Sequence, residues 1–337
     1  MQVAPSRLPA PSALLGLIIL LGLGGLPRLA QTAPTLDALA ERFDHPERYK
    51  YLFERLQARG IARDRIQSAF ATDKAQQRDE RAVELRAEPA RIPDHRADER
   101  EASARQVGRA DIVADHLREH ADLYDRMEAD YGIAREVLAA ILLKESALGR
   151  YDAFNHDAFV VFNSLFDMLA ADTDRKRHLI QLAREQLIAL VIYAHRRDLN
   201  LAETPLPSSY AGAIGIPQFL PVHLSYAVTA DSEGPPNLNK LPDAILSTAN
   251  LIRNKLGWPE GPIDFDQLGD LEAMVANWRE SAAYDDGFEP YQSDRPNLSY
   301  VKRYVAALKR YNPSSDYALG VLRIARQAHK HLPAKSE

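Results

Sequence analysis

The 337-residue chain contains no cysteine. This absence excludes disulfide bonds, thiol nucleophiles and metal sites built on thiolates, and it also excludes a lipid anchor on an N-terminal cysteine. A basic excess is missing as well, because 42 Lys and Arg stand against 47 Asp and Glu, and the formal net charge is −5. A nucleic-acid-binding surface needs clustered positive charge, so we expect no nucleic-acid partner.

Runs in which polar and apolar residues alternate, the pattern of half-buried strands, are also lacking. Apolar residues instead recur every three or four positions, most clearly over 113–131, where Gly132 follows, and again over 179–194, 244–256 and 301–308. The sequence therefore predicts a mainly α fold.

One long apolar run is present, ALLGLIILLGLGGL at residues 13–26, after Arg7 and before Pro27. A basic segment followed by such a run is typical of an export signal, and the run is too short to span a hydrocarbon core of about 30 Å comfortably. We therefore expect residues 1–33 to be a signal peptide and the protein to work in the periplasm. An uncleaved leader that associates with the inner membrane is the alternative.

Two kinds of segment follow the leader. Residues 36–71 hold short helical patterns broken at Pro46 and Gly60. Residues 74–107 are dense in both charges, contain two prolines and have few large apolar side chains, which predicts a solvated linker or a loose helix. We therefore divide the mature chain into an N-terminal helical region with a charged linker, 34–107, and a second domain, 108–337.

The segment HLREH, residues 116–120, matches the H-x-x-E-H pattern of inverted zinc peptidases. His116 and His120 would be zinc ligands on one helix face, with Glu119 as the general base. The pattern fixes only three positions in a chain with ten histidines, and no further acidic ligand is evident. We favour an exposed amphipathic helix face over a metal site.

Glu145 follows the apolar run VLAAILL, on a helix that we expect to end at Gly149. A carboxyl group in apolar surroundings keeps its proton near neutral pH, because desolvation disfavours the ionised form, and such a group can act as a general acid. An ion pair with Lys144 or Arg150 is the structural alternative. The residues around Glu145 do not decide between the two on their own.

The segment SSYAGAIGIPQFLP, residues 208–221, is rich in small residues. Gly212 and Gly215 would let the backbone approach a ligand closely, and Gln218 would offer a donor and an acceptor. A tight packing corner is the alternative reading.

The segment KRYNPSSDYALGVLRIA, residues 309–325, places Tyr311 and Tyr317 around an asparagine and two serines. These side chains could line a binding cleft. A helix N-cap at Ser315, with Tyr317 packed inward, is the structural reading.

In this order, the three segments resemble those of the lytic murein transglycosylases, specifically the membrane-bound lytic transglycosylase B family. YGIAREVLAAILLKESALGRY is similar to the family segment that carries the catalytic glutamate, SYAGAIGIPQFLP to its S-[FY]-A-G-A segment, and RYNPSSDYA to its C-terminal RYN segment. The resemblance covers roughly residues 108–330 and implies a lysozyme-like, mainly helical catalytic domain, with an additional N-terminal helical region in this chain. We expect no cofactor and no metal.

The resemblance also implies an activity and a site. Glu145 matches the catalytic glutamate of a peptidoglycan lytic transglycosylase, which cleaves the β-1,4 bond between N-acetylmuramic acid and N-acetylglucosamine and forms 1,6-anhydromuramyl ends. Peptidoglycan glycan strands are the implied partner. The implied substrate-binding residues are Ser209, Gln218, Phe219, Tyr311, Asn312 and Tyr317.

Some positions depart from the family pattern. Leu148 replaces a family tryptophan, and Leu251 replaces a family tyrosine. A catalytically weakened peptidoglycan-binding or scaffold protein is therefore an alternative function, and a zinc peptidase that uses HLREH is a less favoured one.

Some relatives bind calcium in a loop that corresponds to residues 229–243. Asp231, Glu233 and Asp243 could be ligands here. Prolines and Lys240 interrupt this loop, and it opens on a threonine instead of a carboxylate, so we do not expect calcium binding.

Overall fold

The computed structural model describes residues 34–88, 95–151, 154–231, 234–280 and 296–333. The expected leader and the two prolines of the charged segment lie outside these ranges. Within the described ranges, no helix combines the length and the hydropathy that crossing a membrane requires.

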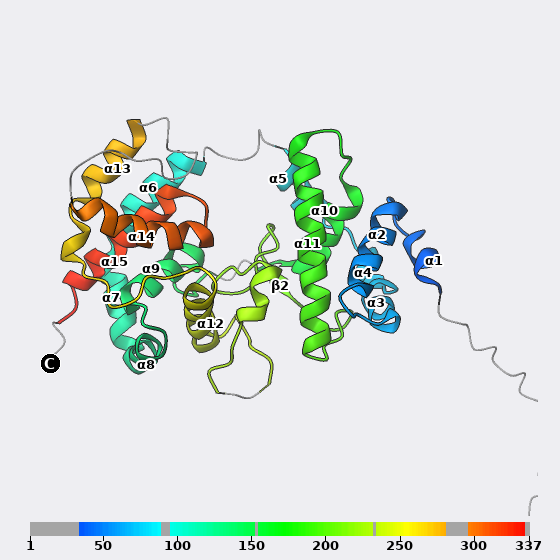
Figure 1. The fold of residues 1–337 in the computed structure, drawn as a ribbon, viewed down its shortest axis with the longest axis horizontal. Helices are drawn as coiled ribbons and strands as arrows, with labels where there is room; N and C mark the ends of the chain where they lie inside the picture. The colour runs from blue at the N-terminus through cyan, green and yellow to red at the C-terminus, as the bar shows by residue number, and fades with distance from the viewer. Residues whose placement is uncertain (1–33, 89–94, 152–153, 232–233, 281–295, 334–337) are drawn as a thin grey trace, which may run out of the picture. The chain divides into compact units, whose positions relative to one another are not determined.

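The described chain is mainly helical (Figure 1), as the apolar spacing predicts. The helices up to the glutamate segment are α1 (Leu36–Ala40), α2 (Pro46–Gln57), α3 (Arg63–Phe70), α4 (Asp73–Gln76), α5 (Glu80–Ala87), α6 (His95–Val107), α7 (Ala110–Glu119), α8 (Ala121–Tyr131) and α9 (Arg135–Ser146). Those that follow are α10 (Ala158–Met168), α11 (Asp174–Arg196), η2 (Pro221–Tyr226), α12 (Leu241–Asn254), η3 (Asp266–Leu268), α13 (Leu271–Glu280), α14 (Pro296–Tyr311) and α15 (Ser315–Lys330). Two short strands, β1 (His156–Asp157) and β2 (Pro207–Ser208), pair antiparallel.

The N-terminal helices are held on α10 by buried polar side chains. Asn163 accepts a hydrogen bond from the Tyr49 hydroxyl at 2.8 Å. Asp167 is fully buried, accepts from the backbone N–H of Asp44 at 2.9 Å and pairs with Arg78. A buried polar group without a partner destabilises the fold, so these bonds fix where α2 and the α4–α5 connection sit on α10.

Helix α9 lies at the centre of a group formed by α7, α8, α12 and α15. Residues 137–142 are all fully buried, and α9 packs against α7, α8, α12 and α15. The turn before α9 contains Gly132, which has a left-handed φ of 61° and ends α8 as predicted. An apolar helix that is covered on all sides explains why this run shows no polar face.

The end of α9 lies three residues before the predicted end. Ala147, Leu148 and Gly149 all have positive φ angles, of 51°, 62° and 79°. The N–H groups of Ala147 and Leu148 donate to carbonyl oxygens of the last turn, which closes the helix at Ser146. Glu145 is therefore the second-to-last residue of α9.

Residues 95–107 form α6, a thirteen-residue helix, where the sequence predicted a solvated linker or a loose helix. Helix α6 packs along α15, and a Cβ atom on Gly320 of α15 would lie 2.3 Å from the Ser103 Oγ atom. Arg100 pairs with the buried Asp316 at 3.1 Å. A helix was one of the two predicted alternatives, but its packing was not predicted, because this contact uses a small residue, a glycine and ion pairs instead of large apolar side chains.

We expect Gly320→Ala to lower the free energy of unfolding by about 1–3 kcal/mol, the usual cost of overpacking a close contact. In an unconstrained helix the same change is stabilising by about 1 kcal/mol, because alanine has the higher helix propensity. Chemical unfolding followed by circular dichroism measures the difference. Gly108→Ala is the matched control, because a Cβ atom there meets its nearest atom at 3.5 Å. A gain of stability in Gly320→Ala would contradict the close packing of α6 on α15.

Candidate active site

Tyr317 connects helix α15 to Glu145. Its hydroxyl donates a hydrogen bond to the Glu145 Oε1 atom at 2.6 Å. Tyr311, the last residue of α14, lies nearly parallel to the Tyr317 ring, with the ring centroids 6.4 Å apart. The Tyr311 hydroxyl donates in turn to the carbonyl oxygen of Pro217, in the loop 208–221. The three segments that the sequence singled out therefore meet at one place.

The same loop also packs on the turn that follows α9. A Cβ atom on Gly149 would lie 3.0 Å from the Ile216 Cδ1 atom, so the two segments are in van der Waals contact. Phe219 approaches Tyr311 with the ring centroids 6.5 Å apart. The loop is thus fixed both to the end of the glutamate's helix and to the tyrosine that stacks on Tyr317.

The surroundings of Glu145 favour its protonated form. Burial raises the pKa of Glu145 to about 7, because desolvation disfavours the ionised carboxylate. The hydrogen bond from Tyr317 and the charge of Lys144 lower this pKa, and the charge of Glu99 raises it. Near neutral pH, a large share of the molecules therefore carries a proton on Glu145.

The proton of the neutral carboxyl group lies away from Tyr317. Burial, and then the charge of Glu145, raise the pKa of Tyr317 well above its usual range, so its hydroxyl remains a donor. Because Oε1 accepts this bond, the proton of the neutral acid is on Oε2. As a whole residue Glu145 is half-buried.

The alternative of an ion pair at Glu145 is wrong. The Lys144 ammonium pairs with Glu99 of α6, and Arg150 is exposed beyond the turn. The sequence did not place α6 at this site, so it could not show that Lys144 forms its ion pair with Glu99.

The loop 208–221 is a tight packing corner. A Cβ atom on Gly212 would lie 2.4 Å from the Phe162 ring, and one on Gly215 would lie 2.5 Å from Leu238. Both glycines have positive φ angles, of 75° and 68°. Packing within the protein therefore already requires glycine at both positions.

Ser209 and Gln218 make no hydrogen bond to Glu145 in the part of the chain that the structure describes. The Gln218 side-chain nitrogen donates to the Gly215 carbonyl oxygen at 2.8 Å, within its own loop. Ser209 accepts at its backbone oxygen from the N–H of Gly212 at 2.8 Å, and the residue is half-buried. Their contact with a substrate stays a prediction.

Two of the aromatic residues predicted to contact substrate are covered by other side chains. Phe219 is 1% exposed and Tyr317 is 3% exposed. The Lys144 ammonium lies 5.1 Å from the Tyr317 ring centroid, and Tyr311 stacks on the same ring. Tyr317 therefore contacts Glu145 through its hydroxyl, and Phe219 supports Tyr311. Tyr311 itself is half-buried and keeps accessible surface.

Asn312 shapes the turn between α14 and α15. Its Oδ1 atom accepts a hydrogen bond from the backbone N–H of Ser314 at 3.1 Å. The N-cap of α15 is Ser314, whose hydroxyl accepts from the N–H of Tyr317 at 3.2 Å. The predicted cap, Ser315, is one residue too late, because it is already the first helical residue. A substrate contact of Asn312 stays a prediction.

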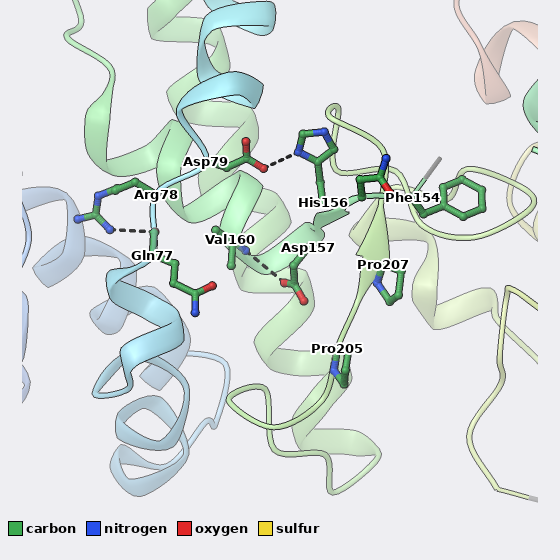
Figure 2. Close-up of a pocket in the computed structure, with 10 residues that line it drawn as sticks. Gln77, Arg78, Asp79, Phe154, His156, Asp157, Val160, Pro205 and Pro207 are labelled. Carbon is green, nitrogen blue, oxygen red and sulfur yellow. Dashed lines mark hydrogen bonds and ion pairs between the residues drawn. The ribbon is translucent and has the colours of Figure 1, made fainter. Parts of the chain in front are cut away.

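A pocket of about 550 Å³ lies beside the short sheet. Figure 2 shows the His156 ring facing the Asp79 carboxylate, with 2.6 Å between His156 Nδ1 and Asp79 Oδ2. Asp157 pairs with Lys74 at 2.8 Å. Both carboxylates thus have partners, and Glu145 does not line the pocket.

The first histidine of HLREH is buried. The Nε2 atom of His116 is 3.0 Å from the Tyr124 hydroxyl, and burial, with the charge of His120 added, lowers the pKa of His116 to about 4. Glu119 is exposed at the end of α7. The prediction that this segment is an exposed helix face is therefore right for Glu119 and wrong for His116, which is buried. Among the described residues, no group of three or more potential metal ligands is found.

In the loop considered for calcium, both oxygens of Asp243 have partners from the backbone. They accept from the N–H groups of Ala230 at 2.8 Å and Asn237 at 2.7 Å. Glu233 lies outside the described residues. Asp243 thus holds the ends of this loop on α12.

A family model, the transglycosylase SLT domain, matches residues 45–326. The chain belongs to the transglycosylase SLT family. It is an enzyme of the lytic transglycosylase class. The match begins well before residue 108, so it includes α2 to α6 of the region 34–107 that we had set apart. A sequence search of curated proteins gave no significant match.

Solved lytic transglycosylases share the fold of this SLT-family chain. Soluble lytic transglycosylase SltB1 from Pseudomonas aeruginosa has a TM-score of 0.59 at 20% identity, over 85% of this chain and 99% of SltB1. Slt35 from Escherichia coli, in complex with bulgecin A, has a TM-score of 0.56 at 18% identity, over 85% of this chain and 93% of Slt35. SltB3 from P. aeruginosa, in complex with NAG-anhNAM-pentapeptide, has a TM-score of 0.55 at 22% identity, over 85% of this chain and 78% of SltB3. The predicted lysozyme-like helical fold is confirmed.

The two leucines that depart from the family pattern are both buried. Leu148 is 5% exposed and Leu251 is fully buried. Leu251 is a core residue of α12, so this leucine offers no surface to a ligand.

Sequence reasoning missed one part of the SLT-family site. Helix α6 brings Glu99 and Ser103 to Lys144, next to the glutamate. The usable signal was weak. A lysine within a buried helix needs a carboxylate partner, but nothing in the charged segment indicates which of its many acids that partner is.

We expect Tyr317→Phe to raise the pKa of Glu145 above about 7, because the lost hydrogen bond stabilises the ionised form. A pH titration of the Glu145 side-chain carbon by NMR measures the change. The phenyl ring keeps its stacking, so stability should fall by only about 1 kcal/mol. Tyr311→Phe is the matched control, because that hydroxyl bonds to Pro217 and the pKa should stay in place. A lower pKa of Glu145 in Tyr317→Phe would contradict the assignment.

Proposed function

We propose that this enzyme cleaves the β-1,4 bond between N-acetylmuramic acid and N-acetylglucosamine in peptidoglycan glycan strands and leaves 1,6-anhydromuramyl ends. The observation that carries the proposal is Glu145, whose pKa is raised to about 7 and whose Oε1 accepts a hydrogen bond from Tyr317. Family membership supports the reaction class. SltB3, which shares the fold, was solved with NAG-anhNAM-pentapeptide and with NAG-NAM-pentapeptide.

In the first step Glu145 acts as general acid. The proton on Oε2 passes to the oxygen that links the two sugars, and the bond from this oxygen to C1 of the muramyl residue breaks. N-acetylglucosamine leaves with the transferred proton. The muramyl N-acetyl group stabilises the positive charge that develops at C1.

In the second step the ionised Glu145 acts as general base. It takes the proton of the muramyl 6-hydroxyl, and the bond from O6 to C1 forms. Glu145 is protonated again and no water is consumed. A pKa near 7 suits both steps, because the same group must donate a proton and then accept one.

A second catalytic carboxylate is not part of this mechanism. Ordinary glycosidases use two, one as the acid and the other as the nucleophile or base. Among the described residues, Glu99 is the other carboxylate whose charge affects the pKa of Glu145, and Glu99 is paired with Lys144. An internal 6-hydroxyl removes the need for a carboxylate that activates water.

The glycan strand would contact residues around Glu145 that keep accessible surface. Tyr311, Ser209 and Gln218 are half-buried and lie on the segments that meet there. Proton transfer supplies only about 10²–10⁴-fold of the acceleration, so these contacts must position the sugar as well.

We propose a periplasmic location for this activity. The apolar run at residues 13–26, preceded by Arg7, supports export, and peptidoglycan lies outside the cytoplasm.

We expect digests of purified peptidoglycan to contain 1,6-anhydromuramyl ends, which are lighter than reducing ends by one water molecule. Liquid chromatography with mass spectrometry separates the two products. Reducing ends would show a hydrolase. Binding of the glycan without any cleavage would show the weakened scaffold protein.

We expect Glu145→Gln to reduce turnover by at least ~10²-fold, because glutamine can neither donate nor accept the proton. Its shape is nearly the same, so folding and glycan binding should persist, and pull-down on insoluble peptidoglycan measures the binding. Glu136→Gln is the matched control: Glu136 is a buried glutamate of the same helix that pairs with His329 at its far end. It should change stability and leave the rate intact. Undiminished cleavage by Glu145→Gln would refute the proposed mechanism.

A further inference from the structure

A buried lysine lies next to the proposed catalytic acid. The Lys144 side chain is 3% exposed, and its ammonium lies 5.1 Å from the ring centroid of Tyr317, the residue that holds Glu145. A cation at this place stabilises the ionised form of a neighbouring carboxyl group. A lone lysine here would work against an acid that has to start the reaction protonated.

Helix α6 supplies the group that balances this charge. Glu99 pairs with the Lys144 ammonium, and Ser103 bridges the two, accepting from Lys144 at 2.8 Å and donating to Glu99 at 3.1 Å. Gly320 leaves the room for this arrangement, because a Cβ atom there would lie 3.2 Å from Lys144 Nζ and 2.3 Å from Ser103 Oγ. The ion pair is therefore built into the contact between α6, α9 and α15.

We propose that Glu99 is a positioning residue of the reaction: it holds and neutralises the Lys144 ammonium, and so lets Glu145 keep the proton that it donates. The inference rests on the proposed function, since it requires Glu145 to act as the acid. Glu99 itself touches neither the substrate nor the transferred proton.

The other ionisable groups near this contact leave the role to Glu99. Burial raises the pKa values of Tyr311 and Tyr317 well above their usual range, so both are neutral. Asp316 of α15 pairs with Arg100 of α6, and this second ion pair adds no net charge. Other ionisable groups on α9 and on the elements packed against it have their own partners: Glu136 of α9 with His329, His116 with Tyr124, and Arg253 with the carbonyl oxygens of Tyr131 and Gly132.

The test is the dependence of kcat/KM on pH. A general acid loses activity as pH rises through its pKa, so the wild-type rate should fall above about pH 7. Glu99→Gln removes the anion and keeps the cation, so the fall should move to lower pH by roughly one unit. At a fixed pH above both transitions this is a loss of about tenfold, while the rate on the low-pH plateau is retained.

Two further variants complete a cycle. Lys144→Met removes the cation and keeps the anion, so the fall in rate should move to higher pH. Glu99→Gln combined with Lys144→Met removes both charges and should return the profile toward wild type. Glu101→Gln is the matched control on α6, because Glu101 is exposed and pairs with Arg105. It should leave the profile in place.

A structural role alone would lower the melting temperature of Glu99→Gln and leave the position of the fall unchanged, which would overturn the proposal. If Glu99→Gln does not melt cooperatively, Lys144→Met decides: an upward move supports the proposal and an unmoved profile overturns it. Failure of the proposed function looks different, because Glu145→Gln would then stay active or the wild-type rate would show no fall above about pH 7.

Discussion

Within the described residues, the Tyr317 hydroxyl is the one hydrogen-bond donor that the fold presents to Glu145. The number of donors matters, because a carboxylate that accepts two or three hydrogen bonds has its pKa driven far below the usual range. A single neutral donor orients the group without overcoming the effect of its apolar surroundings. The rest of the site can be understood as what this one bond requires: a buried tyrosine, an aromatic neighbour that fixes its ring, and a loop that fixes the neighbour.

These supports come from distant parts of the sequence. The two tyrosines lie at the junction of α14 and α15, and the loop that anchors Tyr311 precedes η2. The two glycines of this loop pack against Phe162 and Leu238, so contacts within the protein shape its course. A rigid loop of this kind holds its neighbours in place before any substrate arrives, which is what positioning within a fraction of an ångström demands.

The sequence predicted the helices well because their apolar spacing is regular. An acid next to a run of seven apolar residues drew attention to Glu145, but its proposed role came from the resemblance of three ordered segments to a known family. It could not predict α6, since charged residues that form buried ion pairs look the same in sequence as charged residues in water. It also assigned Phe219 to the substrate, although the ring is buried. A motif indicates which residues gather at a site, while burial decides which of them face it.

The position at which α9 ends has an electrostatic consequence of its own. The aligned peptide dipoles of a helix place about half a negative charge at its C-terminal end, within the last turn. Glu145 lies in that turn because three successive left-handed residues stop the helix directly after Ser146. The backbone thus adds to the resistance of Glu145 against ionisation, while Lys144, one residue earlier, has the charge that a helix end attracts. One more turn of helix would have moved the acid out of this field, so the strained turn at 147–149 helps set the acidity of Glu145.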